Sequence, residues 1–400
     1  MKQKNISTFI YSVIICFIVA FIVAYPGEAF SASADGLMLW FNVVFPSLLP
    51  FFICVEILIG LGIIRLIGSA FKPVMKPVFN VPGEGSFGFF MSIASGYPVG
   101  AKITARLRQD ETCTVHEAQR LLSLCSTSGP LFIVGAVATG ILKSPSAGFL
   151  LAVSHYFSAI TVGFLMRFYY KESRERAKKS CFNPIHDMLD YREKDGRSIG
   201  VLLGDAVNNG ISLILMIGGF IIFFSVITRI LRISGLLDFL SRILCSIFPF
   251  AGITRETMSA ILIGVLEVTN GTKECAALQI PFLSKMVIVS FMMGFGGLSV
   301  NAQVLSIIAK TDLKFGIYMA VKLLQGVMAS IYSYTAFKLL WNIEVFNLHG
   351  AISIDLLDSA GWRQWIGVFC NSSAYLLMSL IFIFLMYFSA KGKRLKHNPF

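Results

Sequence analysis

The stretch SGYPVGAK, Ser95 to Lys102, interrupts an apolar run and decides how this chain folds. The preceding FGFFMSIA could continue as a buried helix, but two glycines and a proline follow at once. Glycine and proline interrupt regular helices, and the backbone groups that an interruption frees are costly to place against lipid. The stretch therefore predicts a place where the backbone leaves helical geometry inside protein and lines a polar cavity.

The composition places this interruption in a membrane. Of the 400 residues, 56% are hydrophobic and only 14% are charged, and the apolar residues form windows near the roughly 20 residues that cross a bilayer. The formal net charge is +12, but the basic residues lie in short loops between apolar windows, as expected of topology determinants. We predict an all-α polytopic membrane protein that binds the lipid bilayer and no nucleic acid.

Eight apolar windows are long enough to cross the membrane: 6–25, 39–64, 118–142, 146–168, 203–228, 284–309, 315–341 and 366–390. Two shorter windows, 86–103 and 257–272, are interrupted and fit re-entrant or broken helices better than full spans. The apolar core of the first window is long for a signal peptide, which favours a permanent anchor. The distribution of Lys and Arg favours a cytosolic location for both termini.

An internal repeat relates the two interrupted windows. A shift of 171 residues (100 to 271) pairs Gly100 with Gly271 and Lys102 with Lys273. Each copy has three crossings, so the copies face opposite ways, as in the inverted repeats of many transporters. The expected organisation is a membrane anchor (1–36), a first repeat (37–170), a basic cytosolic loop (171–202), a second repeat (203–341), and an exterior linker with a last helix and basic tail (342–400).

Four polar clusters are expected to meet near the midplane, two in the interrupted windows and two in the CSTSGP and GGLSVNAQ stretches. Hydroxyls, amides and free backbone N–H groups of this kind can bind an anionic solute. The alternative is close helix packing, for which glycine and serine are also common. The candidate substrate-binding residues are Ser95, Gly96, Tyr97, Gly100, Lys102, Ser126, Thr127, Ser128, Gly129, Thr269, Asn270, Gly271, Lys273, Ser299, Asn301 and Gln303.

Two carboxylates, Glu56 and Glu267, lie at membrane depth, where a charge is costly and often functional. Either could carry a coupling proton. The alternatives are an ion pair with Lys322 for Glu56 and a helix cap for Glu267. Lys102 could equally anchor the cytosolic interface by extending its ammonium into water.

The motifs of common enzymes are missing from the sequence. It contains no HExxH, GxSxG or Walker A pattern, which are the signatures of zinc proteases, serine hydrolases and nucleotide-binding loops. Five scattered histidines do not form a metal-binding pattern. We therefore expect neither an enzyme nor a cofactor or metal.

Three strings, FPSLLPFFI (45–53), SGYPVGAK (95–102) and CSTSGPLFIVGAV (125–137), resemble the YlbJ (SpoVV) family of sporulation integral membrane proteins in the nucleoside-recognition or Gate-domain group. The resemblance implies transport of dipicolinic acid across the outer forespore membrane. Transport of a nucleoside or another organic anion, and a scaffold without transport, remain alternatives. The expected partner is the dipicolinate anion, with a homo-oligomer left open. Lys102→Ala and Lys273→Ala are expected to lower transport.

Overall fold

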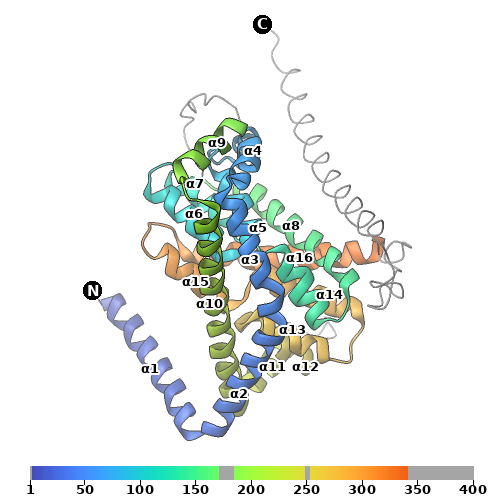
Figure 1. The fold of residues 1–400 in the computed structure, drawn as a ribbon. Helices are drawn as coiled ribbons and strands as arrows, with labels where there is room; N and C mark the ends of the chain where they lie inside the picture. Colours follow the sequence, from blue (N-terminus) through green and yellow to red (C-terminus); the bar gives the residue numbers. More distant parts are fainter. Residues whose placement is uncertain (1, 171–183, 248–252, 341–400) are drawn as a thin grey trace, which may run out of the picture. The chain divides into compact units, whose positions relative to one another are not determined.

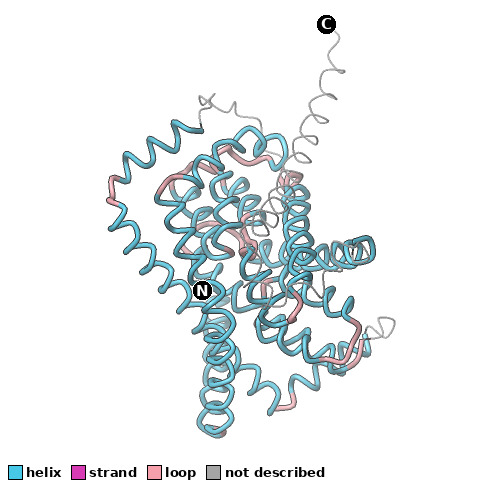
Figure 2. The backbone as a smooth tube through the Cα atoms, turned by 45° about the vertical axis from the view of Figure 1, so that its right-hand side comes forward, coloured by secondary structure: helices cyan, strands magenta, loops and turns pink. Residues whose placement is uncertain are grey.

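The computed structural model describes residues 2–170, 184–247 and 253–340, and within these ranges every regular element is a helix (Figures 1 and 2). Contacts divide the chain into Met1–Leu339 and Leu340–Phe400. The predicted span 366–390, the predicted linker and tail (342–400) and residues 171–183 of the predicted basic loop lie outside the described residues. The all-α prediction is confirmed for the part of the chain that is described.

Two long antiparallel helical rods form the frame. The first is continuous from Pro26 to Gly60 and consists of α2 (Pro26–Leu39), the wider π-helix η1 (Trp40–Val44) and α3 (Phe45–Gly60); the second is α10 (Ile199–Ile233). Gly60 lies against Leu202 near one end of the pair, and Gly36 lies against Ser225 near the other. Each rod has 35 residues, so at 1.5 Å per residue it is about 50 Å long.

Each rod leads into the same series of helices. After α3 come α4 (Ile63–Phe79), α5 (Gly85–Ser95), α6 (Tyr97–Gln109), α7 (Val115–Leu124), the π-helix η2 (Phe132–Ile141) and α8 (Pro145–Met166). After α10 come α11 (Leu236–Ile247), α12 (Arg255–Leu266), α13 (Val268–Ala277), α14 (Phe282–Phe295), α15 (Gly297–Ile308) and α16 (Phe315–Leu340). Adding 171 to the bounds of α5 gives 256–266, which differs from α12 by one residue.

The two copies are inverted. Because the rods are antiparallel, α4 leaves the frame at the Gly60 end and α11 leaves it at the Ile233 end, and Figure 1 shows α4 and α11 at opposite ends of α10. The Thr161 and Tyr332 hydroxyls are hydrogen-bonded at 2.8 Å, and these residues are repeat mates (161 + 171 = 332). A contact between equivalent positions is expected where a pseudo-two-fold axis passes between the copies.

Two predicted spans contain breaks in their helices. The window 118–142 is broken at Cys125–Gly129, between α7 and η2, and the window 284–309 is broken at Gly296, between α14 and α15. Apolar flanks make both windows look continuous, although each contains a glycine- and serine-rich stretch. Within the described residues, five helical stretches are long and apolar enough to cross a membrane, fewer than the eight spans expected for the whole chain. One of the five is Phe282–Ile308, which contains the break at Gly296.

Helix α1 (Lys2–Ala24) packs near the start of the first rod, where Phe21 and Ile22 meet a small core around Val226 and Ile230. Helix α9 (Pro184–Asp195) covers α4, and its Asp187 accepts hydrogen bonds from Ser69 and Lys72. Many large apolar side chains on the long helices point outward, among them Phe17, Leu215, Phe223, Leu323 and Ile331. Such an apolar exterior suits helices surrounded by lipid.

Candidate functional site

Four helix breaks meet between the repeats. The first is at Gly96 (φ 87°, ψ −171°), a backbone conformation open only to glycine. The second is the unwound segment Cys125–Gly129, and a Cβ built on Gly96 would lie 3.4 Å from the nitrogen of Gly129. The third is at Glu267 and the fourth at Gly296 and Gly297, both with positive φ. A Cβ on Gly297 would lie 3.4 Å from the Cα of Glu267, so the breaks lie side by side in pairs.

A cavity opens where these breaks meet. The space inside it that a water-sized molecule can occupy is about 80 Å³. Most of its apolar lining comes from the rods and η2: Leu48, Phe51, Phe52, Phe132, Leu213, Ile217, Phe220 and Ile221. The polar part comes from the breaks. A mostly apolar wall with a few polar groups at one side is the usual construction of a pocket for a small organic molecule.

About half of the predicted binding residues line this cavity. They are Ser95, Gly96, Tyr97, Ser128, Gly129, Thr269, Ser299 and Gln303, and Glu267 joins them. The breaks therefore bring together residues that are far apart in the sequence, in the manner that the repeat predicts. Their binding role stays a prediction.

The remaining predicted residues do not line it. Ser126, Thr127 and Asn301 are buried behind the wall, and Gly100 and Gly271 are buried in the hairpins. A Cβ on Gly100 would lie 2.0 Å from the carbonyl oxygen of Cys125, and one on Gly271 would lie 2.1 Å from the Cα of Gly264. These two glycines therefore allow close packing, the alternative considered from the sequence.

Both predicted lysines lie outside the cavity. Lys102 is exposed on α6, and Lys273 is exposed on α13. Lys273 and Asn270 line a second, more polar cavity beside Arg229, Arg232 and Glu274. Neither lysine lines the main cavity, and a binding role for either one stays a prediction.

Glu267 caps a helix at the cavity wall. Its side chain is 2% exposed, and its two carboxylate oxygens accept hydrogen bonds from the backbone N–H groups of Thr269 (3.0 Å) and Asn270 (2.6 Å). These are N–H groups of the first turn of α13, which have no partner within the helix. The capping alternative is thus confirmed, and the negative charge of the carboxylate lies at the positive end of the helix dipole.

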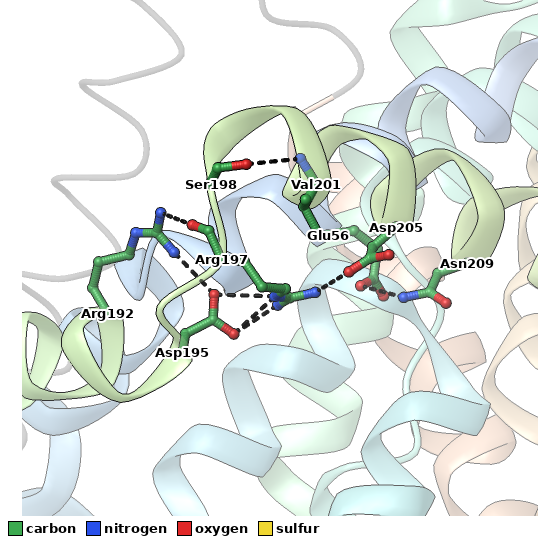
Figure 3. Close-up of polar contacts among 8 residues, drawn as sticks. All are labelled: Glu56, Arg192, Asp195, Arg197, Ser198, Val201, Asp205 and Asn209. Carbon is green, nitrogen blue, oxygen red and sulfur yellow. Dashed lines mark hydrogen bonds and ion pairs between the residues drawn. The ribbon is translucent and has the colours of Figure 1, made fainter.

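Glu56 lies elsewhere. Its carboxylate accepts a hydrogen bond from Asn209 (3.2 Å) across the two rods, near the Arg197–Asp205 ion pair (Figure 3). An ion pair between Glu56 and Lys322, considered from the sequence, is wrong, because the ammonium of Lys322 contacts other groups. Glu56 is therefore not a residue of the cavity.

Tyr97 connects the cavity to a buried polar network. Its hydroxyl donates to the carbonyl oxygen of Met293 (2.5 Å) and accepts from Ser128 Oγ (2.7 Å). The backbone N–H of Ser128 donates to Nε2 of His155 (2.9 Å), and the Tyr156 hydroxyl donates to the carbonyl oxygen of Ser128 (2.9 Å). The unwound segment thus obtains from side chains the hydrogen bonds that a helix would have supplied.

Sequence reasoning missed three residues of this network, His155, Tyr156 and Lys322, as parts of the site. Lys322 is 0% exposed on α16, and its ammonium donates to the carbonyl oxygen of Ser126 (2.8 Å) and to Oε1 of Gln325 (2.6 Å). A lysine within an apolar span was the available signal, since charged groups at membrane depth are rarely neutral to function.

Comparison with known proteins gives the family. A family model described as Gate, nucleoside recognition, matches residues 41–166, which run from η1 to the end of α8. The sporulation integral membrane protein YlbJ of Bacillus subtilis (strain 168) is 41% identical over 348 residues, or 85% of each chain. The chain belongs to the YlbJ family. Like YlbJ, it is an integral membrane protein, as the composition and the apolar helices indicate.

Two solved structures resemble this chain at much lower sequence identity than YlbJ does. A CNTnw variant in an intermediate state has a TM-score of 0.46 and 13% identity, covering 84% of this chain and 86% of that chain. CNTnw in an inward-facing substrate-bound state also has a TM-score of 0.46 and 13% identity, covering 84% of this chain and 85% of that one.

Proposed function

We propose that this YlbJ-family protein is a membrane transporter of a small organic anion, and that the anion is dipicolinate, carried across the outer forespore membrane during sporulation. The observation that carries the proposal is the cavity enclosed by four helix breaks from two inverted repeats. Irregular backbone at membrane depth is tolerated where it lines a cavity, and inverted repeats with broken helices are the plan of many secondary transporters. The proposed mechanism is alternating access to this cavity from the two sides.

The backbone favours an anion over a neutral solute. Helix α15 begins at the cavity with Gly297, its N-cap Gly296 offers no side-chain hydrogen bond, and Ser299 in its first turn lines the cavity. The free N–H groups at such a helix start, together with its positive dipole end, attract negative charge. Aromatic residues Phe51, Phe52 and Phe132 could pack on the flat ring of dipicolinate while the helix start binds a carboxylate.

We also propose that transport is coupled to protons, and that Glu267 is the residue that binds and releases the coupling proton. Of the two carboxylates considered from the sequence, Glu267 lines the cavity and Glu56 does not. A Glu267→Gln protein that still transports, but no longer responds to a proton gradient, would agree with this role. An unchanged response to the gradient would remove Glu267 from the coupling step.

Uptake of labelled dipicolinate into vesicles that contain only the purified full chain tests the proposal. We expect uptake that saturates and is competed by unlabelled dipicolinate but not by uridine. Competition by uridine would favour the nucleoside alternative, in line with the description of the Gate model. A folded protein that moves neither solute would favour the scaffold.

A matched pair of variants connects transport to the cavity. Ser299 lines the cavity and Ser306 lies exposed further along the same helix α15. Ser299→Phe should abolish uptake by filling the cavity, while Ser306→Phe should leave it within about twofold of the unmodified protein, since surface changes are usually well tolerated. Equal uptake by both variants would place the transport path elsewhere.

A further inference from the structure

Lys322 lies directly behind the cavity wall, at the junction of the two repeats. Its ammonium is 4.9 Å from the centroid of the Tyr97 ring, and Tyr97 lines the cavity. It donates to the carbonyl oxygen of Ser126 in the unwound segment of the first repeat. A Cβ built on Gly296, at the break of the second repeat, would lie 3.8 Å from Cε of Lys322. The lysine therefore contacts breaks from both copies.

The surroundings of Lys322 fit a charged ammonium. An ammonium has three N–H donors and accepts nothing. The carbonyl oxygen of Ser126 and Oε1 of Gln325 take two of them, and the face of the Tyr97 ring suits the third as a cation–π contact. Every contact found for this nitrogen is thus with an acceptor.

No carboxylate balances this charge within the described ranges. The ion pairs found there all involve other cations. Glu267 is the carboxylate that lines the cavity, but both of its oxygens bind the N–H groups at the start of α13. A buried charge is usually paired, because burial without a partner is expensive. The amino group of Lys322 thus has no carboxylate partner among the described residues.

We infer that Lys322 is the specificity-determining charge of the cavity: its buried ammonium, acting across the Tyr97 ring, selects a carboxylate-bearing solute over a neutral one of the same shape. A carboxylate of the bound solute supplies the anionic partner that Lys322 lacks. The inference rests on the proposed function for the identity of the solute as a carboxylate, but the positive potential that it requires can be measured without any substrate.

Two ligands of nearly equal shape test the selection, pyridine-2,6-dicarboxylate and its neutral diamide. The purified full chain should bind the dicarboxylate, and Lys322→Gln should weaken that binding by at least about tenfold, the size expected for removing a charge within roughly 10 Å at intermediate dielectric. Binding of the diamide should change less than twofold. Lys322→Arg should retain the preference for the dicarboxylate, and Lys338→Gln, at an exposed lysine of the same helix, should match the unmodified protein.

Equal losses for both ligands in Lys322→Gln would show a merely structural role, and no loss for either would also overturn the inference. A second measurement separates it from the proposed function. Gln303 lines the cavity. In a cysteine-free background, the rates at which the cysteine of Gln303→Cys reacts with anionic and cationic methanethiosulfonates report the local electrostatic potential. We expect the ratio of the anionic to the cationic reaction rate to be about tenfold or more higher with Lys322 in place than in Lys322→Gln. An unchanged ratio in Lys322→Gln overturns the inference even if the protein transports no dicarboxylate.

Discussion

At the scale of single residues, the cavity owes its form to side chains that replace missing helical hydrogen bonds. Glu267 does so for α13, and His155 and Tyr156 do so for Ser128 in the unwound segment. These bonds are buried or partly buried, and a buried N–H or C=O group left unpaired costs about 1 to 3 kcal/mol. The residues of the wall therefore stabilise the backbone and shape the cavity at once.

Removing the cap at Glu267 should destabilise the protein. Glu267→Ala leaves the N–H groups of Thr269 and Asn270 without their carboxylate partner, so we expect a loss of about 1 to 2 kcal/mol in the free energy of unfolding. Glu267→Gln keeps one side-chain acceptor and should lose less. Thermal unfolding of the purified variants would measure both. Equal stability of Glu267→Ala and the unmodified protein would mean that water replaces the cap.

The two repeat-related lysines should differ in their effect on transport. Lys102 is exposed and lines neither of the cavities described above, whereas Lys273 lines the second one. Lys102→Ala should therefore leave dipicolinate uptake within about twofold of the unmodified protein, as usual for surface changes. This replaces the expectation drawn from the sequence. A large loss in Lys102→Ala, with normal insertion, would restore that expectation.

At the scale of elements, the frame depends on close contact between the two rods. The indole N–H of Trp40 donates to the carbonyl oxygen of Ile214 (3.0 Å), and the ring lies over Gly218. A Cβ on Gly218 would be 2.6 Å from this ring, but a Cβ on Gly219 would have no atom within 4 Å. Two adjacent glycines of one helix thus have different surroundings.

Gly218→Ala and Gly219→Ala should therefore have different effects on the stability of the protein. The methyl group at 218 must push Trp40 away from the rod, at a cost of about 1 to 3 kcal/mol typical of overpacking. The same methyl group at 219 meets nothing and should leave stability unchanged or raise it by up to about 1 kcal/mol through helix propensity. Thermal unfolding in one detergent compares them. Equal melting temperatures would show that the rods are not packed as described.

The elements were predictable to different degrees. Gly96 and Pro98 predict the break between α5 and α6, and the internal repeat predicts the corresponding break between α12 and α13. The break at Cys125–Gly129 was foreseen as a polar cluster but not as an interruption, since hydrophobic residues on both sides complete a window of spanning length. Lys322 shows why the site was only partly predictable. Its partner Ser126 lies 196 positions away, and no local pattern indicates which carbonyl group a buried lysine will contact.

At the scale of the whole molecule, polar contacts connect the two repeats away from the cavity. Arg108 of α6 forms an ion pair with Asp312, in the loop between α15 and α16, at 2.8 Å. The Gln119 side chain donates to the carbonyl oxygen of Lys314 and accepts from its N–H group. These contacts connect the α6–α7 region of one copy to the α15–α16 loop of the other.

Acid should weaken the Arg108–Asp312 connection. The hydrogen bond from Arg108 lowers the pKa of Asp312. A carboxyl group with a lowered folded-state pKa stabilises the protein above its unfolded-state pKa of about 3.9, and loses that contribution as the pH falls through the folded-state value. Because both side chains are partly exposed, the contribution should be below about 1 kcal/mol.

Asp312→Asn is the matched comparison. It should lower the melting temperature slightly at neutral pH, and the difference from the unmodified protein should shrink as the pH falls below about 4. Melting curves of the two proteins across this pH range would measure it. A difference that stays constant with pH would mean that Asp312 acts through packing and not through its charge.

The contacts that cross between the copies also limit how the chain can be divided. Tyr97 needs Met293, Lys322 needs Ser126, and Gln119 needs Lys314, so each half holds donors whose acceptors are carried by the other. Tyr97, Lys322 and Gln119 are buried, so leaving these donors without their acceptors would be costly. If the gene is divided between the halves, the two fragments should accumulate only when both are made in the same cell. Two copies of one half would lack the acceptors that the other half supplies, so they should not form a stable homodimer with the same cavity wall.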